Sequence, residues 1–574
     1  DVSPEPDQVT PPEDVDAAPE PDVVEPPQDT GGPTPPEDTG GPVVDKLEID
    51  LNINAISLSG LTNLEPVVTG GGVVMGVEFY VDGVSLWTDF IPPYSLMVNT
   101  ASYADGPHTI TVYTADNTGQ AASDETIITF DNSPPVFTKT VPEEGKPLFY
   151  EDRPLTMELE TDDMNSLEFV RLRAAGFLMG EFFNPPFLVQ KAWDDIYVFE
   201  DLLPTTVNVR FFARDQLGLE TEVTYNVEVH RRFDWKYENL GQVWSPAVAF
   251  ANGNIAFATA TSANSGRFVI LSPEGELVWE YDIGSAGAVR TPIVYDPVHD
   301  RVLVSTLGGH VIAFNNGNGP AWDNNLSYPL ASMAVHGSQV YALTIYGEIR
   351  VINTSNGTND WTVGSITSDS VFSRIAVDDN GRAYFGDSGG ELFAVTQSGT
   401  EWSKQAGEEV QAEPIISPEG VVYFGAADGF IYAQAADGSD LWKTDVDGEL
   451  ACKMYQDPES GDLFVLSGIK DMTRLDDETG DELWTVPLEG WVPGTGITVG
   501  DDGTLYAAGA LGRIYAVDPE TGEVLWNHLL ADESNDVTDE QFYAAPLVSG
   551  GKLYIGNENT YFYSLNLVAP EVVE

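Results

Sequence analysis

Seven residues with aromatic or basic side chains recur at equivalent places between positions 244 and 543, and together they could bind a ligand. Aromatic rings bring a large contact area at little entropic cost, and arginine donates directional hydrogen bonds to carboxylate or phosphate. This mixture suits a glycan, a peptide or an anionic group. The candidate ligand-binding residues are Trp244, Arg290, Arg374, Lys453, Trp491, Arg513 and Tyr543. The alternative is that they are ordinary loop and packing residues, because loops vary for reasons other than function.

Catalytic and metal-binding chemistry is only weakly indicated. The single cysteine, Cys452, has no identifiable base partner. The six histidines do not pair at the spacing of zinc ligands. Asp116, Asp131 and Asn132 are weak calcium candidates at the joint between two domains, with solvated linker residues as the alternative. No catalytic residue is predicted.

The candidate ligand-binding residues lie in a repeat with a period near 42 residues. The repeat is marked by tryptophans 39 to 44 residues apart, and several short apolar strands separate each from the next. These tryptophans are Trp235, Trp279, Trp322, Trp361, Trp402, Trp442, Trp484 and Trp526. Such a period is typical of a β-propeller blade. We interpret the tryptophan as structural, packing one outer strand onto its neighbour.

The most complete repeat, Gly512 to Trp526, carries a recognisable motif. Ala516, Asp518, Gly522 and Trp526 match Ala-x-Asp-x-x-x-Gly-x-x-x-Trp. The repeat thereby resembles that of quinoprotein-type (PQQ-like repeat) β-propellers and of the outer-membrane assembly propeller lipoprotein. Quinoprotein dehydrogenases of this type hold pyrroloquinoline quinone and calcium beside two adjacent cysteines. This chain has no such pair, so PQQ is not expected. No cofactor is predicted, and calcium binding is left as an open alternative.

The ends of the repeat array indicate how the propeller closes. The last unit, Ala545 to Leu567, contains three strands and no closing tryptophan. The segment Phe233 to Glu238, with Trp235, stands before the first full unit and can supply the missing outer strand. The ring would then close with eight blades and no free sheet edge at the seam. In this register both loop types that carry the candidate ligand-binding residues share one face.

Two strand-rich segments precede the repeats. Both alternate short strands with turns and show no helical period, and the pentapeptides at 90–94 and 183–187 share an aromatic-x-Pro-Pro-aromatic pattern. Regular short strands favour β-sandwiches. The segments resemble bacterial immunoglobulin-like domains, the first more closely than the second.

The N-terminal 45 residues hold 12 prolines and 13 acidic residues, with no lysine or arginine. Such a composition predicts a disordered, extended spacer. A chain without an initiating methionine suggests a removed leader, and the spacer resembles the tether of bacterial lipoproteins; a free secreted tail is the alternative. The net charge of −67 argues against nucleic acid and anionic lipid as partners.

We therefore predict an all-β protein: an eight-bladed β-propeller preceded by two β-sandwich (Ig-like) domains and a disordered acidic, Pro-rich tail. The expected divisions are 1–45, 46–132, 133–232, 233–567 and a C-terminal tail 568–574. The leading functional hypothesis is a non-enzymatic, monomeric binding or scaffold protein outside the cytoplasm, with an extracellular or periplasmic protein or glycan as partner. It would be a cell-surface or outer-membrane lipoprotein, touching the membrane only through a lipid anchor, or a secreted or periplasmic protein. The alternatives are a propeller enzyme, either a quinoprotein dehydrogenase or a polysaccharide-cleaving enzyme, and an outer-membrane assembly factor.

Overall fold

The computed structural model describes most of the chain as two compact units, Asp1–Ser133 and Pro134–Glu574. The described residues are 45–55, 57–152, 154–162, 167–239, 241–262, 265–450, 453–467, 471–488, 496–509, 512–530 and 542–568. The predicted disordered spacer lies outside them, apart from Asp45. No helix in these ranges has the length and hydrophobicity needed to cross a membrane.

The first unit contains a β-sandwich. Its main sheet has the order β2-β9-β8-β5-β6, formed by β2 (Ser57–Leu58), β9 (Ala121–Phe130), β8 (Gly106–Asp116), β5 (Val74–Val81) and β6 (Val84–Asp89). Two short pairs complete it, β1 (Glu48–Asp50) with β4 (Val67–Thr69), and β3 (Leu61–Leu64) with β7 (Leu96–Asn99); η1 spans Thr100–Ser102. Alternate residues such as Val77, Phe79, Ile110 and Val112 are fully buried, as expected for strands with one face on a core.

The second unit begins with another sandwich. Its five-stranded sheet has the order β11 (Leu148–Phe149), β17 (Glu220–His230), β16 (Thr205–Asp215), β13 (Leu167–Ala174) and β14 (Phe177–Phe182). The three-stranded sheet has the order β10 (Phe137–Val141), β12 (Leu155–Thr161) and β15 (Phe187–Lys191). Two short 3-10 turns, η2 (Trp193–Ile196) and η3 (Glu200–Leu202), follow β15. Trp193 and Phe211 are among its fully buried side chains.

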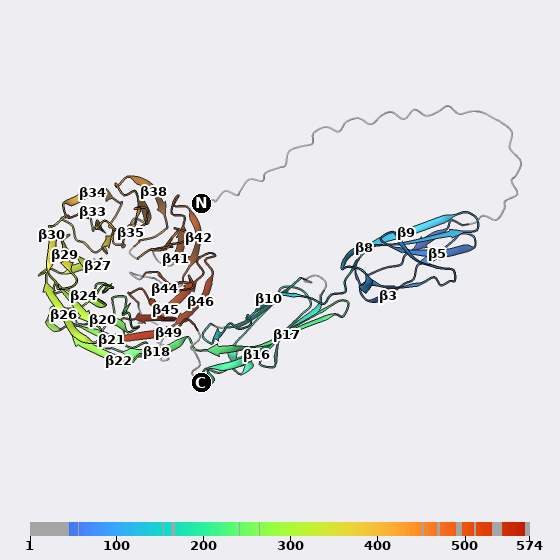
Figure 1. The fold of residues 1–574 in the computed structure, drawn as a ribbon, viewed down its shortest axis with the longest axis horizontal. Helices are drawn as coiled ribbons and strands as arrows, with labels where there is room; N and C mark the ends of the chain where they lie inside the picture. The colour runs from blue at the N-terminus through green and yellow to red at the C-terminus, as the bar shows by residue number, and fades with distance from the viewer. Residues whose placement is uncertain are drawn as a thin grey trace, which may run out of the picture. The chain divides into compact units, whose positions relative to one another are not determined.

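The rest of the second unit is a series of four-stranded antiparallel sheets that follow one another round a ring (Figure 1). Blade 1 consists of β19 (Val248–Ala249), β20 (Ile255–Ser262), β21 (Ser265–Leu271) and β22 (Leu277–Asp282), and blade 2 of β23 (Val294–Asp296), β24 (Arg301–Ser305), β25 (His310–Asn315) and β26 (Asn318–Asn325). Blade 3 consists of β27 (Leu330–His336), β28 (Gln339–Thr344), β29 (Ile349–Asn353) and β30 (Asn359–Val363), and blade 4 of β31 (Ala376–Val377), β32 (Ala383–Gly386), β33 (Glu391–Thr396) and β34 (Gly399–Gln405). A 3-10 turn, η4 (Gly284–Ala286), joins the first two.

Blades 5 to 8 follow the same plan. Blade 5 consists of β35 (Ile415–Ile416), β36 (Val422–Gly425), β37 (Phe430–Gln434) and β38 (Asp440–Asp445), and blade 6 of β39 (Tyr455–Gln456), β40 (Leu463–Ser467), β41 (Asp471–Leu475) and β42 (Glu482–Pro487). Blade 7 consists of β43 (Thr498–Val499), β44 (Leu505–Ala508), β45 (Arg513–Val517) and β46 (Val524–Leu529), and blade 8 of β47 (Leu547–Ser549), β48 (Lys552–Gly556) and β49 (Tyr561–Asn566) with β18 (Phe233–Glu238). The second and third strands are almost wholly buried because each blade packs against a neighbour on both faces.

The last blade is completed by a strand from the start of the propeller. β18 pairs antiparallel with β49, with Trp235 opposite Ser564 and Glu238 opposite Tyr561 (Figure 1). The prediction that the strand around Trp235 supplies the missing outer strand is therefore confirmed. Because the two strands are more than 300 residues apart in sequence, their hydrogen bonds close the ring.

Outer-strand tryptophans tie successive blades together. The Trp442 indole Nε1 donates to the Asp477 carbonyl oxygen, 2.8 Å away, in the turn before the outer strand of the next blade. Gly480 in that turn has φ 76° and lies against the Trp442 ring, so that a Cβ there would stand 2.6 Å from a ring carbon. The indole bond recurs at Trp235, Trp322, Trp402 and Trp484. In each of the five cases, a glycine with positive φ in the same turn faces the ring.

The seam between blades 7 and 8 uses a different partner. Blade 8 has no turn between β49 and β18, and Arg232 occupies that place, its carbonyl oxygen accepting from the Asn566 amide at 2.6 Å. The Arg232 guanidinium lies 3.9 Å from the centre of the Trp526 ring and 4.0 Å from that of Phe149 in the second sandwich. It also donates to both carboxylate oxygens of Asp152, at 2.5 and 2.6 Å. Arg232 therefore joins the second sandwich to the seam.

We expect Gly522→Ala to destabilise the propeller by about 2–4 kcal/mol, because alanine must adopt φ 73° and its Cβ would meet the Trp484 ring at 2.8 Å. Gly503→Ala is the matched control: φ is 85° there, but nothing lies within 4 Å of the added Cβ. The control should cost only about 1–2 kcal/mol. Urea unfolding followed by tryptophan fluorescence measures both, and equal costs would contradict the role given to the ring.

We expect Arg232→Ala to cost about 3–5 kcal/mol, because it leaves the Asp152 carboxylate poorly solvated and without its cation. Burial already raises the pKa of Asp152 against the opposing effect of Arg232. The control is Arg210→Ala, which breaks an exposed ion pair with Glu222 in the same sandwich and should cost less than about 1 kcal/mol. Calorimetry of the full chain gives both values. Similar losses of stability in the two variants would contradict the role of Arg232 in joining the second sandwich to the propeller.

Candidate functional site

Loops lead into the inner strands of the blades, and the antiparallel meander places the described parts of these loops on one face of the propeller. Side-chain hydroxyl groups join neighbouring blades on this face. Ser245 Oγ accepts from the Ile293 amide at 2.8 Å, and Thr498 Oγ1 donates to the Pro546 carbonyl oxygen at 2.6 Å. These bonds join the backbone near Trp244 and Tyr543 to the neighbouring blades.

Three of the candidate residues form one cluster on this rim. The Trp244 ring stacks on Tyr543, with centroids 4.4 Å apart and planes at 17°. The exposed Arg290 guanidinium lies 5.0 Å from the Trp244 ring centre. Gln242 orients the indole by accepting from its Nε1 at 3.2 Å, and donates in turn to Glu558 at 3.0 Å. Aromatic surface and a cation thus come together from blades 1, 2 and 8.

Two further candidate residues share one carboxylate on the loops into blades 4 to 6. Arg374 Nη1 lies 3.7 Å from Glu413, and Lys453 Nζ lies 3.1 Å from the same side chain. Glu413 is partly buried, whereas Lys453 is exposed. Two cations facing one carboxylate give this trio a net positive charge in a strongly acidic chain. We call these three residues together with Trp244, Arg290 and Tyr543 the rim site.

The remaining candidates do not join the rim site. Arg513 begins β45, and its Nη1 donates to the Asn527 side chain on the outer strand β46. Trp491 lies outside the described residues. The assignment of ligand binding to the seven residues stays a prediction.

The three calcium candidates are not brought together. The Asp116 carboxylate accepts from the amides of Gly72 at 2.6 Å and of Thr118 and Gln120 at 2.9 Å, which lowers its pKa to about 2. Asn132 instead contacts Thr100 and Asp105 near the other end of the 11-residue strand β8. Across residues 45–568, as far as they are described, no three His, Cys, Asp or Glu side chains are placed to hold a metal ion.

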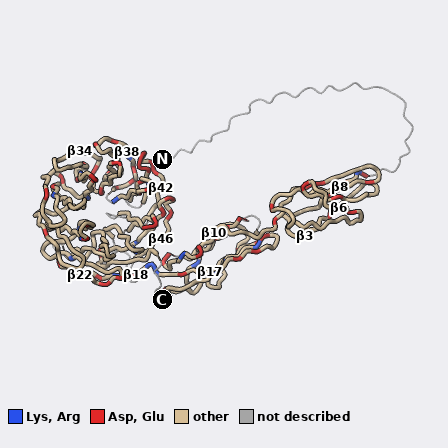
Figure 2. The backbone as a smooth tube through the Cα atoms, viewed as in Figure 1, with Lys and Arg blue, Asp and Glu red and all other residues tan. Residues whose placement is uncertain are grey.

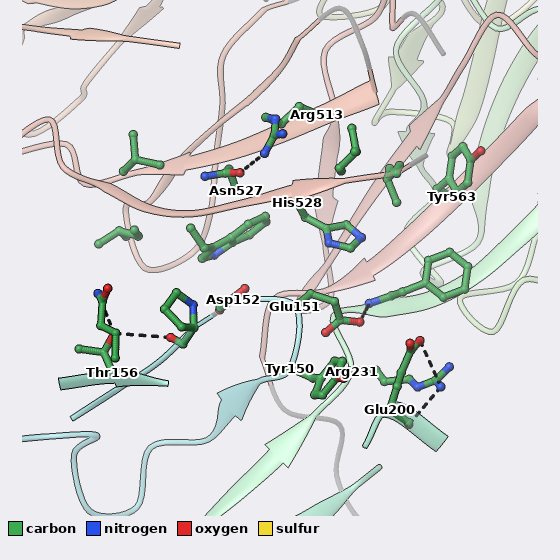
Figure 3. A pocket seen from close by; sticks show the side chains of 18 of the residues that line it. Tyr150, Glu151, Asp152, Thr156, Glu200, Arg231, Arg513, Asn527, His528 and Tyr563 are labelled. Atoms are coloured by element: carbon green, nitrogen blue, oxygen red, sulfur yellow. Dashed lines mark hydrogen bonds and ion pairs between the residues drawn. The ribbon is translucent and has the colours of Figure 1, made fainter. Parts of the chain in front are cut away.

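A groove that the sequence did not indicate lies between the second sandwich and blade 7 (Figure 3). It has a volume of about 1140 Å³ and follows Glu523 to Leu530, the whole of β46. Its opposite wall comes from Tyr150, Glu151 and Thr156 of the sandwich, with Glu200 and Arg231 at one end. Segments more than 350 residues apart form it, and no local motif marks such a site.

His528 on β46 is the titratable group whose environment in this groove is most unusual. Its burial, reinforced by the positive charge of Arg232, lowers its pKa from 6.5 to about 4. Asp152 and Glu200 oppose this shift and Arg513 adds to it. The imidazole is therefore neutral at physiological pH.

Comparisons with known proteins agree with this architecture. A family model described as "Outer membrane protein assembly factor BamB" matches residues 264–450 and 468–569, about half of the chain. The chain belongs to this family. A bacterial Ig domain model matches residues 53–112, within the first sandwich, so the BamB-type propeller here follows an Ig-like domain. No curated protein matches the chain.

Solved structures resemble this BamB-family propeller at low identity. Sqt1 from Chaetomium thermophilum is 11% identical and covers 58% of this chain and 98% of its own, with a TM-score of 0.51. BamB from Moraxella catarrhalis is 14% identical and covers 58% of this chain and 99% of its own, with a TM-score of 0.46. At these identities the likeness to Sqt1 shows a shared fold and nothing about function.

We expect the pKa of His528 to make the second unit less stable as the pH falls from about 6.5 to about 4. In this window the unfolded histidine binds a proton that the folded one does not, so the free energy of unfolding falls by up to about 1.4 kcal/mol per pH unit. His528→Gln should remove this part of the pH dependence. Urea titrations of both proteins at pH 7.5 and 4.5 measure it, and an identical pH dependence would contradict the burial of the imidazole.

Proposed function

We propose that this protein is a non-enzymatic binding and scaffold protein of the bacterial envelope, which presents a BamB-type propeller together with Ig-like domains. Membership of the BamB family and the bacterial Ig domain support a role outside the cytoplasm. A cell-surface or outer-membrane lipoprotein, or a secreted or periplasmic protein, fits this placement. A role in outer-membrane protein assembly is the second candidate, and the family match alone favours it.

The rim site is the proposed ligand-binding face, and the stacked Trp244–Tyr543 pair with Arg290 above it carries the proposal. Stacked rings held by Gln242 offer a rigid apolar surface that loses little entropy on binding. Arg290 adds directional donors beside it. This arrangement binds a partner by surface complementarity and needs no reacting group.

The charge of the rim site points to the chemistry of the partner. Arg290, Arg374 and Lys453 stand with Glu413 on this face, while acidic residues outnumber basic ones elsewhere along the chain (Figure 2). These cations attract anionic groups locally, although the protein as a whole repels them. We therefore propose a partner with exposed carboxylate or phosphate groups, either an acidic segment of an envelope protein or an anionic glycan.

We expect the full-length wild type to bind acidic peptides or anionic glycans on arrays, and the double variant Arg290→Glu/Lys453→Glu to lose at least tenfold in affinity. Wild-type affinity should also fall as salt rises, because exposed charges are screened.

The matched control is Lys139→Glu/Arg210→Glu, which makes the same change in net charge on the second sandwich, where both residues are partly exposed. It should bind almost as the wild type does. Equal losses in the two double variants would show a general charge effect and contradict the rim site.

A further inference from the structure

The outer strands of the blades differ in one property that bears on binding. An outer strand leaves a row of backbone N–H and C=O groups unpaired, and proteins protect such edges with charged residues or proline. Seven of the eight outer strands carry at least one charged residue, such as Lys236, Glu280, Asp323, Asp360, Lys404, Lys443 and Glu482. β46, with the sequence Val-Leu-Trp-Asn-His-Leu, has neither a charged residue nor a proline. Its one titratable group, His528, is neutral at physiological pH because burial lowers its pKa to about 4.

The unprotected strand is also the one that lines the groove. Every residue from Glu523 to Leu530 contributes to the lining, so the groove runs along the strand instead of opening over one residue. β46 is the last strand of its sheet, hydrogen-bonded on one side to β45 and to no strand on the other among the described residues. The sandwich therefore stands beside this edge but leaves a volume of about 1140 Å³ between them.

The two walls of the groove are held at a fixed separation by Arg232. Its guanidinium joins Asp152 on the sandwich wall to the Trp526 ring on the propeller wall, and donates to the Asn566 carbonyl oxygen at 3.2 Å. Glu151 accepts from the amides of Arg232 and Phe233, which fixes the adjoining segment. A groove with fixed walls can bind an extended chain at low cost in ordering.

We propose that the groove binds an extended polypeptide segment of a partner protein, which adds as a further strand to the free edge of β46. This proposal goes beyond the rim site, because the groove lies at the side of the propeller and involves none of the rim residues. In strand addition, main-chain hydrogen bonds supply affinity and the side chains beside the edge supply selectivity.

The lining defines the chemistry of the segment. Leu525, 49% exposed, offers an apolar contact next to the edge. Charged residues of both signs line the groove in nearly equal number, Glu151, Asp152, Glu200 and Glu523 against Arg231, Lys236 and Arg513, although the chain as a whole has 92 acidic and 25 basic residues. Charge complementarity therefore favours a segment without net charge that alternates apolar and small polar residues, and disfavours a strongly acidic one such as the chain's own N-terminal spacer.

The test uses a fluorescent peptide of alternating valine and threonine, titrated into the full-length protein, with a second peptide in which the central valine is proline. The wild type should bind the first peptide and bind the proline peptide at least tenfold more weakly, because proline has no amide hydrogen and disfavours strand pairing. Bound peptide should slow hydrogen exchange of the amides in β46, a measurement that needs no variant.

Leu525→Lys places on β46 the kind of charge that the other outer strands carry, and should weaken binding at least tenfold. The matched control is Leu483→Lys on β42: Leu483 also directly precedes the blade's tryptophan and is 50% exposed, but it does not line the groove. It should leave binding unchanged. Leu525→Glu, with the opposite charge, should act like Leu525→Lys.

Three outcomes would overturn the proposal. The first is that the wild type binds neither peptide and exchange in β46 does not change. The second is that Leu483→Lys and Leu525→Lys weaken binding equally, which would indicate unspecific pairing with any outer strand. The third is self-association of the chain, seen by sedimentation and abolished by Leu525→Lys, without peptide binding; the occupant would then be a second copy.

Discussion

The contact on which the propeller depends is that between the outer-strand tryptophan of one blade and the turn of the next. The indole hydrogen bond satisfies a turn carbonyl, and a glycine without a side chain lets the ring lie flat on the backbone. Each such contact joins neighbouring blades only, so a ring of them is complete only if its two ends also meet. β18 and β49 join the two ends of the ring by strand pairing. Trp235 joins them as well, because its indole hydrogen-bonds to the turn of blade 1.

The seam shows what happens where the repeated contact is not available. Trp526 faces the start of β18 and not a turn, and Arg232 covers its ring. The same guanidinium pairs with Asp152, so the residue that completes the propeller also fixes the second sandwich against it. The groove beside β46 follows from this arrangement, because the sandwich is held close to the outer strand of blade 7 without filling the space next to it.

The two proposed binding surfaces differ in the charges of their residues. The rim site places one cation beside stacked aromatic rings and two cations beside a carboxylate, which favours an anionic partner. The groove has an uncharged edge strand and a lining of both signs, which favours recognition of the main chain. The two surfaces lie on different parts of the same propeller and could be occupied at the same time, as a scaffold requires.

The sequence by itself determined the architecture of this protein, because a 42-residue period of strands and tryptophans is a local pattern and leaves few ways to bury the apolar faces. It also placed Trp244, Arg290 and Tyr543 on one rim, since register fixes which face a loop occupies. Only the tertiary structure decided that the calcium candidates lie apart, because the extended strand β8 separates them, and that Arg513 turns to Asn527. The groove could not be predicted from the sequence, because contacts between β46 and a sandwich hundreds of residues away depend on how whole domains dock.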